Sequence, residues 1–181
     1  MDPFVGLIDR AEEKLGHSPH PMIVSLPLGA WCVSQTCDLL AVITGDRTYD
    51  DAARISMAIG LAGAAGAVVT GLRDYSFIPK HRPSHEVATR HALGNAVVGT
   101  LFTASYILRQ RDRACGRPTG WLARLLGWTG GSLALYTAWL GGELVARYGE
   151  AVKPVMERLE KSELEAADQR EIPPMAGVSG R

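Results

Sequence analysis

The chain has 181 residues, enough for one domain, and its hydrophobic content of 46% is ordinary for a protein of this size. Lys plus Arg and Asp plus Glu number 19 each, so the net charge indicates neither a nucleic-acid partner nor an acidic tail. The charges nevertheless gather in short segments separated by nearly uncharged stretches. This segregation is typical of membrane proteins, and the expected partner is a lipid bilayer.

Residues 1–18 predict a short amphipathic helix. Apolar side chains recur at helical spacing from Phe4 to Leu15, and Asp9, Arg10 and Glu12 lie on the opposite side. Such a helix fits the surface of a membrane and the surface of a protein equally well. The segment therefore predicts a helix without fixing what it lies on.

Residues 19–150 are predicted to form one transmembrane domain. Its four apolar stretches are about 22–44, 52–72, 88–108 and 121–148. At about 1.5 Å per residue, each is long enough to cross a hydrocarbon core of about 30 Å. Pro27 is expected to bend the first span, because proline removes a helical hydrogen bond. The predicted fold class is all-α, an integral membrane four-helix bundle with short amphipathic helices near both termini.

The polar segments between the spans are interpreted as turns and loops. They comprise 45–54, the proline-containing 73–87 and the arginine-rich 109–118. Residues 151–181 predict an amphipathic helix followed by a disordered tail. We found no internal sequence repeat of useful strength.

Four spans predict a multi-pass protein of the cell (inner) membrane with both termini on the same side. A count of Lys and Arg near the span ends favours a cytoplasmic location for the termini. The dense arginine cluster at 109–117 favours the opposite orientation. The sequence does not determine the oligomeric state.

One group of polar residues is expected at the end of the bundle from which the termini emerge. It consists of His20, Asp74, His91, Asn95 and Glu143. Ionisable groups in membranes are costly and are therefore functional candidates. We interpret His20 and His91 as candidate ligands of a metal ion or haem, with the other three around them. Mutual hydrogen bonding, or a site for a quinone or another small ligand, also fits these residues.

A second polar group, Asp38 and Gln35, lies on one face of the first span nearer the opposite side of the membrane. A carboxylate at this depth requires a partner. Arg54, Thr103 and Thr129 are candidates, and a protonated carboxyl bonded to a helix carbonyl is an alternative. A structural role is favoured for this group.

Four motifs in order resemble the bacterial family of membrane proteins known as domain of unknown function 2231. They are HPMIVSLPLGAW followed by Asp38, then GLRDY, RHALGN and AWLGGELVARYG. The resemblance covers about residues 19–150 and implies four membrane spans and an unassigned function. Some relatives continue into a Rieske iron–sulfur domain, which implies a link to membrane redox chemistry. Residues 150–181 contain no Cys or His, so no such cluster is expected there.

Two functions follow as hypotheses. The first is a redox or cofactor-binding membrane subunit, holding haem or a metal ion and working with a redox partner such as a Rieske-type protein. The second is a non-enzymatic membrane scaffold or a small-molecule transport component. The sequence contains no phosphate loop, zinc-protease motif or nucleophile elbow, so catalysis by this chain alone is not expected.

Overall fold

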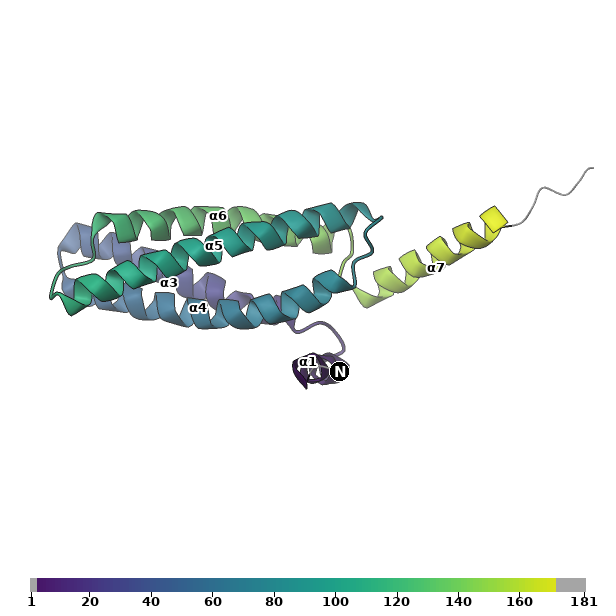
Figure 1. The fold of residues 1–181 in the computed structure, drawn as a ribbon, viewed down its shortest axis with the longest axis horizontal. Helices are drawn as coiled ribbons and strands as arrows, with labels where there is room; N and C mark the ends of the chain where they lie inside the picture. The colour runs from purple at the N-terminus through teal and green to yellow at the C-terminus, as the bar shows by residue number, and fades with distance from the viewer. Residues whose placement is uncertain (1–2, 172–181) are drawn as a thin grey trace, which may run out of the picture.

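The computed structural model describes residues 3–171, and the described residues are helical with no strand. The all-α prediction is confirmed. Four long helices run side by side, with the α3–α4 and α5–α6 connections at one end and α1 and α7 at the other (Figure 1). We call these the loop end and the terminal end. The predicted disordered tail, residues 172–181, lies outside the described residues.

The first half of the bundle is a helical hairpin. A short helix α2 (His20–Ile23) leads into α3 (Ser25–Thr44), and α4 (Arg47–Ser76) returns along it. The break at Val24 fits the predicted effect of Pro27, whose ring clashes with the carbonyl four residues earlier. At the loop end, Gly45 adopts a φ of 72°, a left-handed conformation that costs glycine little.

The start of α4 is capped by Asp46. Its carboxylate accepts a hydrogen bond of 2.8 Å from the backbone N–H of Thr48. This backbone hydrogen bond lowers the pKa of Asp46 below its usual value. The predicted polar turn at 45–54 is therefore mostly helix, because the cap allows α4 to begin at Arg47.

The second half is a hairpin of α5 (Pro83–Ala114) and α6 (Trp121–Ala146). The predicted loop at 73–87 is shorter than expected, since α4 continues to Ser76 and Pro83 begins α5. Proline is tolerated in the first helical turn, where its missing N–H has no partner to lose. The expected break at 109–118 is also partly wrong, because α5 continues through Arg109 to Ala114.

Two further helices lie at the terminal end. In α1 (Pro3–Leu15), Asp9 and Glu12 form ion pairs with Arg73 near the end of α4, and the Asp9 contact measures 2.9 Å. In α7 (Lys153–Glu171), Glu163 pairs with Arg82 at 2.8 Å. Leu7 and Leu15 of α1 remain exposed. Both terminal helices are thus tied to the bundle by ion pairs.

The centre of the bundle is a small apolar core. It consists of Trp31, Met57, Val98, Phe102 and Ala134. The rings of Trp31 and Phe102 stack with centroids 4.0 Å apart and planes inclined by 14°. This stack joins α3 to α5 across the middle of the bundle.

Candidate functional site

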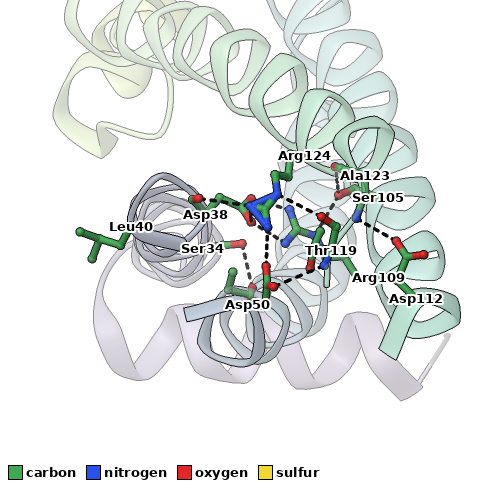
Figure 2. Close-up of polar contacts among 12 residues, drawn as sticks. Ser34, Asp38, Leu40, Asp50, Ser105, Arg109, Asp112, Thr119, Ala123 and Arg124 are labelled. Atoms are coloured by element: carbon green, nitrogen blue, oxygen red, sulfur yellow. Dashed lines mark hydrogen bonds and ion pairs between the residues drawn. The ribbon is translucent and has the colours of Figure 1, made fainter. Parts of the chain in front are cut away.

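A buried ion-pair network joins α3 and α5 toward the loop end. The Arg109 guanidinium donates two hydrogen bonds to the Asp38 carboxylate, at 2.7 Å and 2.5 Å (Figure 2). Both side chains are fully buried. Paired bonds of this kind are strong and fix the orientation of both groups. The expected partners Arg54, Thr103 and Thr129 are therefore wrong, since Asp38 binds a residue that the sequence analysis had placed in a loop.

The network continues into α4 and α6. Arg124 donates to the Asp50 carboxylate at 2.6 Å and to the Asp38 carbonyl at 3.3 Å (Figure 2). Asp50 also accepts from the backbone N–H of Thr119 at 3.3 Å. Two arginines and two aspartates thus balance one another, and each of the four long helices contributes one of them. Balanced pairing offsets the large cost of burying charge.

Two serines near the ion-pair network donate hydrogen bonds to the backbone of neighbouring helices. Ser34 donates to the Ala53 carbonyl at 2.8 Å, and Ser105 donates to the Ala123 carbonyl at 2.6 Å (Figure 2). The first bond joins α3 to α4 and the second joins α5 to α6. Small residues and interhelical hydrogen bonds of this type hold helices together where lipid supplies no hydrophobic drive.

The histidine group lies toward the terminal end. His91 bonds the Thr137 carbonyl through Nδ1 at 2.8 Å, and its Nε2 lies 3.1 Å from the amide nitrogen of Asn95. In the neutral ring, Nδ1–H donates and Nε2 accepts, so both nitrogens have protein partners. Thr137 donates to Asn95 Oδ1 at 3.1 Å and closes the group. Ligation of a metal or haem by His91 would require breaking one of these bonds.

His20 faces the same end from the other hairpin. Its Nδ1 lies 3.0 Å from the Thr70 hydroxyl, and both Asp74 and His91 are close enough to act on its charge. Asp74 accepts a bond of 2.5 Å from Ser18. The structure thus brings together four of the five predicted residues, whereas Glu143 contacts Arg147 one helical turn further on. Within residues 3–171, no group of three or more His, Cys, Asp or Glu side chains is arranged to hold a metal ion.

Gln35, the other predicted polar residue of the first span, packs against α6. A Cβ atom at Gly131 would overlap the Gln35 amide, so the glycine leaves room for this side chain. Gln35 also lines a shallow hollow between α3 and α6 together with Trp31. Its role in the structure is the close approach of these two helices.

The two hairpins repeat the same contacts. Residues of α5 lie 71 positions after their counterparts in α2 and α3, and those of α6 lie 70 after their counterparts in α4. The corresponding pairs are His20 and His91, Trp31 and Phe102, Ser34 and Ser105, Asp38 and Arg109, Ala53 and Ala123, and Gly60 and Gly130. Trp31 stacks on Phe102, and Asp38 pairs with Arg109. Counterparts that meet each other are expected of two units related by a two-fold axis.

Glycines at corresponding positions of the two hairpins also have corresponding roles. A Cβ atom at Gly60 would overlap the Trp31 ring, and one at Gly130 would lie 3.3 Å from the Phe102 ring. After α3 and α5, Gly45 and Gly116 both adopt positive φ, at 72° and 67°. The repeat that the sequence analysis did not find is therefore present in the contacts.

A cavity of about 210 Å³ lies beside the ion-pair network at the loop end. Its lining includes five arginines, namely Arg47, Arg54, Arg109, Arg113 and Arg117. Two aspartates, Asp50 and Asp51, also line it. The positive charge of the lining therefore exceeds its negative charge.

The sequence matches the family described as "Predicted membrane protein (DUF2231)" over residues 16–154. The chain belongs to this family. Searches of curated proteins and of solved structures gave no match. Membership of DUF2231 confirms the predicted resemblance and makes this a membrane protein of unknown function.

Two helical stretches of this DUF2231 protein are long and apolar enough to cross a membrane by length and composition, within the residues that the structure describes. They are His20–Thr44, which joins α2 and α3, and Arg47–Ser76, which is α4. Helices α5 and α6 do not meet the same measure. Their polar side chains include Arg109 and Arg124, which the fold buries.

Sequence reasoning missed Asp50, Arg109 and Arg124. Asp50 and Arg109 stand in charged segments predicted as a turn and a loop, and Arg124 stands at the start of the fourth predicted span. Pattern alone does not distinguish an exposed arginine at such a place from a buried one. A usable signal existed, because Phe102, Ser105 and Arg109 repeat the spacing of Trp31, Ser34 and Asp38. Pairing these two triplets would have placed Arg109 opposite Asp38.

Proposed function

We propose that this protein is a non-enzymatic scaffold of the inner membrane, a multi-pass bundle that holds its four long helices in one fixed arrangement. The observation that carries the proposal is the use of buried polar side chains. Asp38, Arg109, Arg124 and Asp50 bind one another, and His91 binds Asn95 and Thr137. Groups engaged in this way favour a structural role over chemistry.

The exposed surface supports four spans. Large apolar side chains face outward from each long helix, including Leu39 and Ile43 on α3, Val68 and Val69 on α4, Leu93 and Val97 on α5, and Leu125 and Leu135 on α6. Exposed apolar surface of this extent marks contact with lipid or a partner. The proposed membrane domain comprises residues 19–150, with 1–18 and 151–181 as appended segments outside the bilayer.

The alternative is a cofactor-binding redox subunit with His20 and His91 as ligands, assisted by Asp74, Asn95 and Glu143. The placement of both histidines toward the terminal end of the bundle supports it. The bonding of both His91 nitrogens and the separate pairing of Glu143 favour the scaffold. A Rieske-type or other redox partner belongs to this alternative.

Purified protein from cells supplied with iron and haem separates the two functions. His91→Ala removes two partly buried hydrogen bonds, and we expect it to lower the free energy of unfolding by about 1–3 kcal/mol. His20→Ala is expected to cost less, because His20 has one such bond. The measurements are thermal unfolding in detergent, an optical spectrum and metal analysis for both variants and for wild type.

The scaffold proposal requires that neither variant changes the spectrum or the metal content. A Soret band or one bound metal per chain that disappears in His91→Ala would overturn it and establish the cofactor alternative. Unchanged stability in both variants would also contradict the scaffold proposal.

We further propose that both termini face the cytoplasm. Several basic residues lie at the terminal end, including Arg73, Arg82 and Arg90. At the loop end, Arg109 of the 109–117 cluster and Arg124 of α6 are paired with aspartates inside the bundle. Exposed Cys115 at the loop end then faces outward. A charged, impermeant maleimide should label it in intact spheroplasts and leave Cys115→Ser unlabelled. Labelling only after lysis would reverse the orientation.

A further inference from the structure

The repeat exposes an arginine that lacks the partner of its counterpart. Arg54 on α4 corresponds to Arg124 on α6, at the same separation of 70 residues as Ala53 and Ala123. Arg124 binds Asp50 at 2.6 Å. The residue that corresponds to Asp50 in the second hairpin is Gly120, which has no side chain. The carboxylate that would complete the second pair is therefore missing from the sequence.

The contacts of Arg54 reflect this difference. Its Nη1 lies 3.4 Å from the Gln110 side-chain oxygen, and its Nη2 lies 3.4 Å from the Asp51 carboxylate. Its Nε is buried and has no hydrogen-bond partner. The side chain retains only 15% of its accessible surface. A largely buried guanidinium with long contacts and one unsatisfied N–H is costly unless an anion binds it.

The surroundings of Arg54 suit an anion. The cavity of about 210 Å³ that it lines also receives Arg47, Arg113 and Arg117. Its two aspartates are already engaged, Asp50 by Arg124 and Asp51 by Arg113 at 2.8 Å. Arginine binds phosphate oxygens in paired geometry, which makes it the usual residue for such sites.

The size and position of the cavity indicate which class of ligand it could bind. The cavity is smaller than the roughly 300–1,000 Å³ of sites for drug-sized molecules, so it suits one small anionic group. It lies where α3 ends at Thr44 and α4 begins at Arg47, which is the depth of phospholipid headgroups if these helices span the bilayer.

We propose that the arginine-lined cavity at the loop end binds a phosphate group, with Arg54 as its principal ligand. The group completes the ion pair that Gly120 leaves open. Both free phosphate and the headgroup of an anionic phospholipid carry this chemistry, and the test distinguishes them. The inference does not require the scaffold proposal, because a cofactor-binding bundle would contain the same cavity.

The first arm of the test uses inorganic phosphate with protein in an uncharged detergent. Binding is measured as the rise in unfolding temperature against chloride at matched ionic strength. The second arm compares nanodiscs of phosphatidylcholine with nanodiscs that also contain phosphatidylglycerol. Stabilisation by phosphate indicates a free anion, and stabilisation confined to phosphatidylglycerol indicates a lipid headgroup. The absence of both overturns the proposal.

Three variants assign the effect to this cavity. Arg54→Gln should weaken binding about tenfold, the loss typical of one charged hydrogen-bonding group. The matched control is Arg111→Gln, an exposed arginine of α5 at the loop end that does not line the cavity, and it should change binding by less than about twofold. Equal effects of these two variants would contradict a built site.

Asp51→Asn keeps the proposal testable if Arg54→Gln fails to fold. It removes the carboxylate that competes for Arg54 and Arg113, so binding should become about threefold tighter. A purely structural arginine cluster predicts no gain. Unchanged or weaker phosphate binding in Asp51→Asn would overturn the assignment.

Discussion

The hairpin of α2–α4 and the hairpin of α5–α6 make corresponding contacts at corresponding positions. At one pair of positions, however, the two side chains have opposite charges. Serines, histidines and stacked aromatic rings occupy matching places in both halves. Asp38 and Arg109 also match in position, but they carry opposite charges. Neutral side chains can face their counterparts across a two-fold axis, whereas like charges buried together repel strongly. The difference teaches that burying an ion pair at this axis requires two halves that are no longer identical.

The largest expected effect comes from breaking this pair. Asp38→Asn leaves a buried guanidinium without its carboxylate, and Arg109→Gln leaves the carboxylate without its guanidinium. Each should lower the free energy of unfolding by about 3–5 kcal/mol. The measurement is denaturant unfolding in mixed micelles, and the matched control is Asp112→Asn, whose partner Arg117 is largely exposed.

Exchanging the two charges sharpens the comparison further. In the double variant Asp38→Arg with Arg109→Asp, the ion pair re-forms with its charges exchanged between the two helices. By the correspondence of the hairpins, Arg54 would then lie beside the new aspartate at 109, as Arg124 lies beside Asp38. We expect the double variant to be at least about 2 kcal/mol more stable than either single charge reversal, by the same measurement. Additive destabilisation would show that the two hairpins are not equivalent around this pair.

Glycine substitutions test the equivalence of the aromatic contacts, with a smaller effect. Gly60→Ala places a methyl group inside the Trp31 ring and should cost about 1–3 kcal/mol, because the ring is held by its stack on Phe102. Gly130→Ala meets Phe102 at 3.3 Å, and the gain in helix propensity of about 1 kcal/mol should largely offset the contact. Thermal unfolding measures both.

The control for this pair is Gly99→Ala on α5, where a Cβ atom meets nothing within 4 Å. It should be neutral or stabilising. Equal losses at Gly60 and Gly130 would mean that the two hairpins pack their aromatic residues with the same tolerance, against the structure.

The smallest expected effect concerns α7, which has no counterpart in the repeat. Its Glu163 binds Arg82, and this hydrogen bond lowers the pKa of Glu163. The same bond raises the pKa of Arg82. A lowered carboxyl pKa stabilises docking above the usual glutamate pKa, and the stabilisation is lost as the pH falls through the folded value.

The protection of α7 amides from hydrogen exchange, measured relative to the intrinsic rate at each pH, should therefore be high at neutral pH and low below about pH 4. Glu163→Gln should give the low protection, and so the fast exchange, already at neutral pH while leaving the bundle unchanged. The control is Glu165→Gln, whose exposed partner Lys161 lies 4.0 Å away. Slow exchange in Glu163→Gln would show that another contact holds the helix.

The fold was predictable because hydropathy and helical spacing act locally. The all-α class and the bend near Pro27 each follow from short sequence windows. The helix ends were less predictable, since Arg109 lies within α5 and binds Asp38 on another helix, a partner that no local pattern reveals. Glu143 illustrates the same limit, because its membership of the histidine group depended on rotation about α6, and the helix directs it to Arg147 instead. Pairings across the bundle require the three-dimensional arrangement.

The ion pair between the hairpins has a consequence for biosynthesis. Arg109 follows Asp38 by 71 residues, so at about 5–20 residues per second the ribosome delivers it roughly 4–14 seconds later. In the proposed membrane arrangement, the first hairpin holds Asp38 without its partner during that interval, at a depth where an unpaired ionisable group is costly. The first hairpin would then stay at the insertion machinery until the second hairpin arrives. A chain truncated after Ser76 should accordingly be a substrate for membrane quality-control proteases.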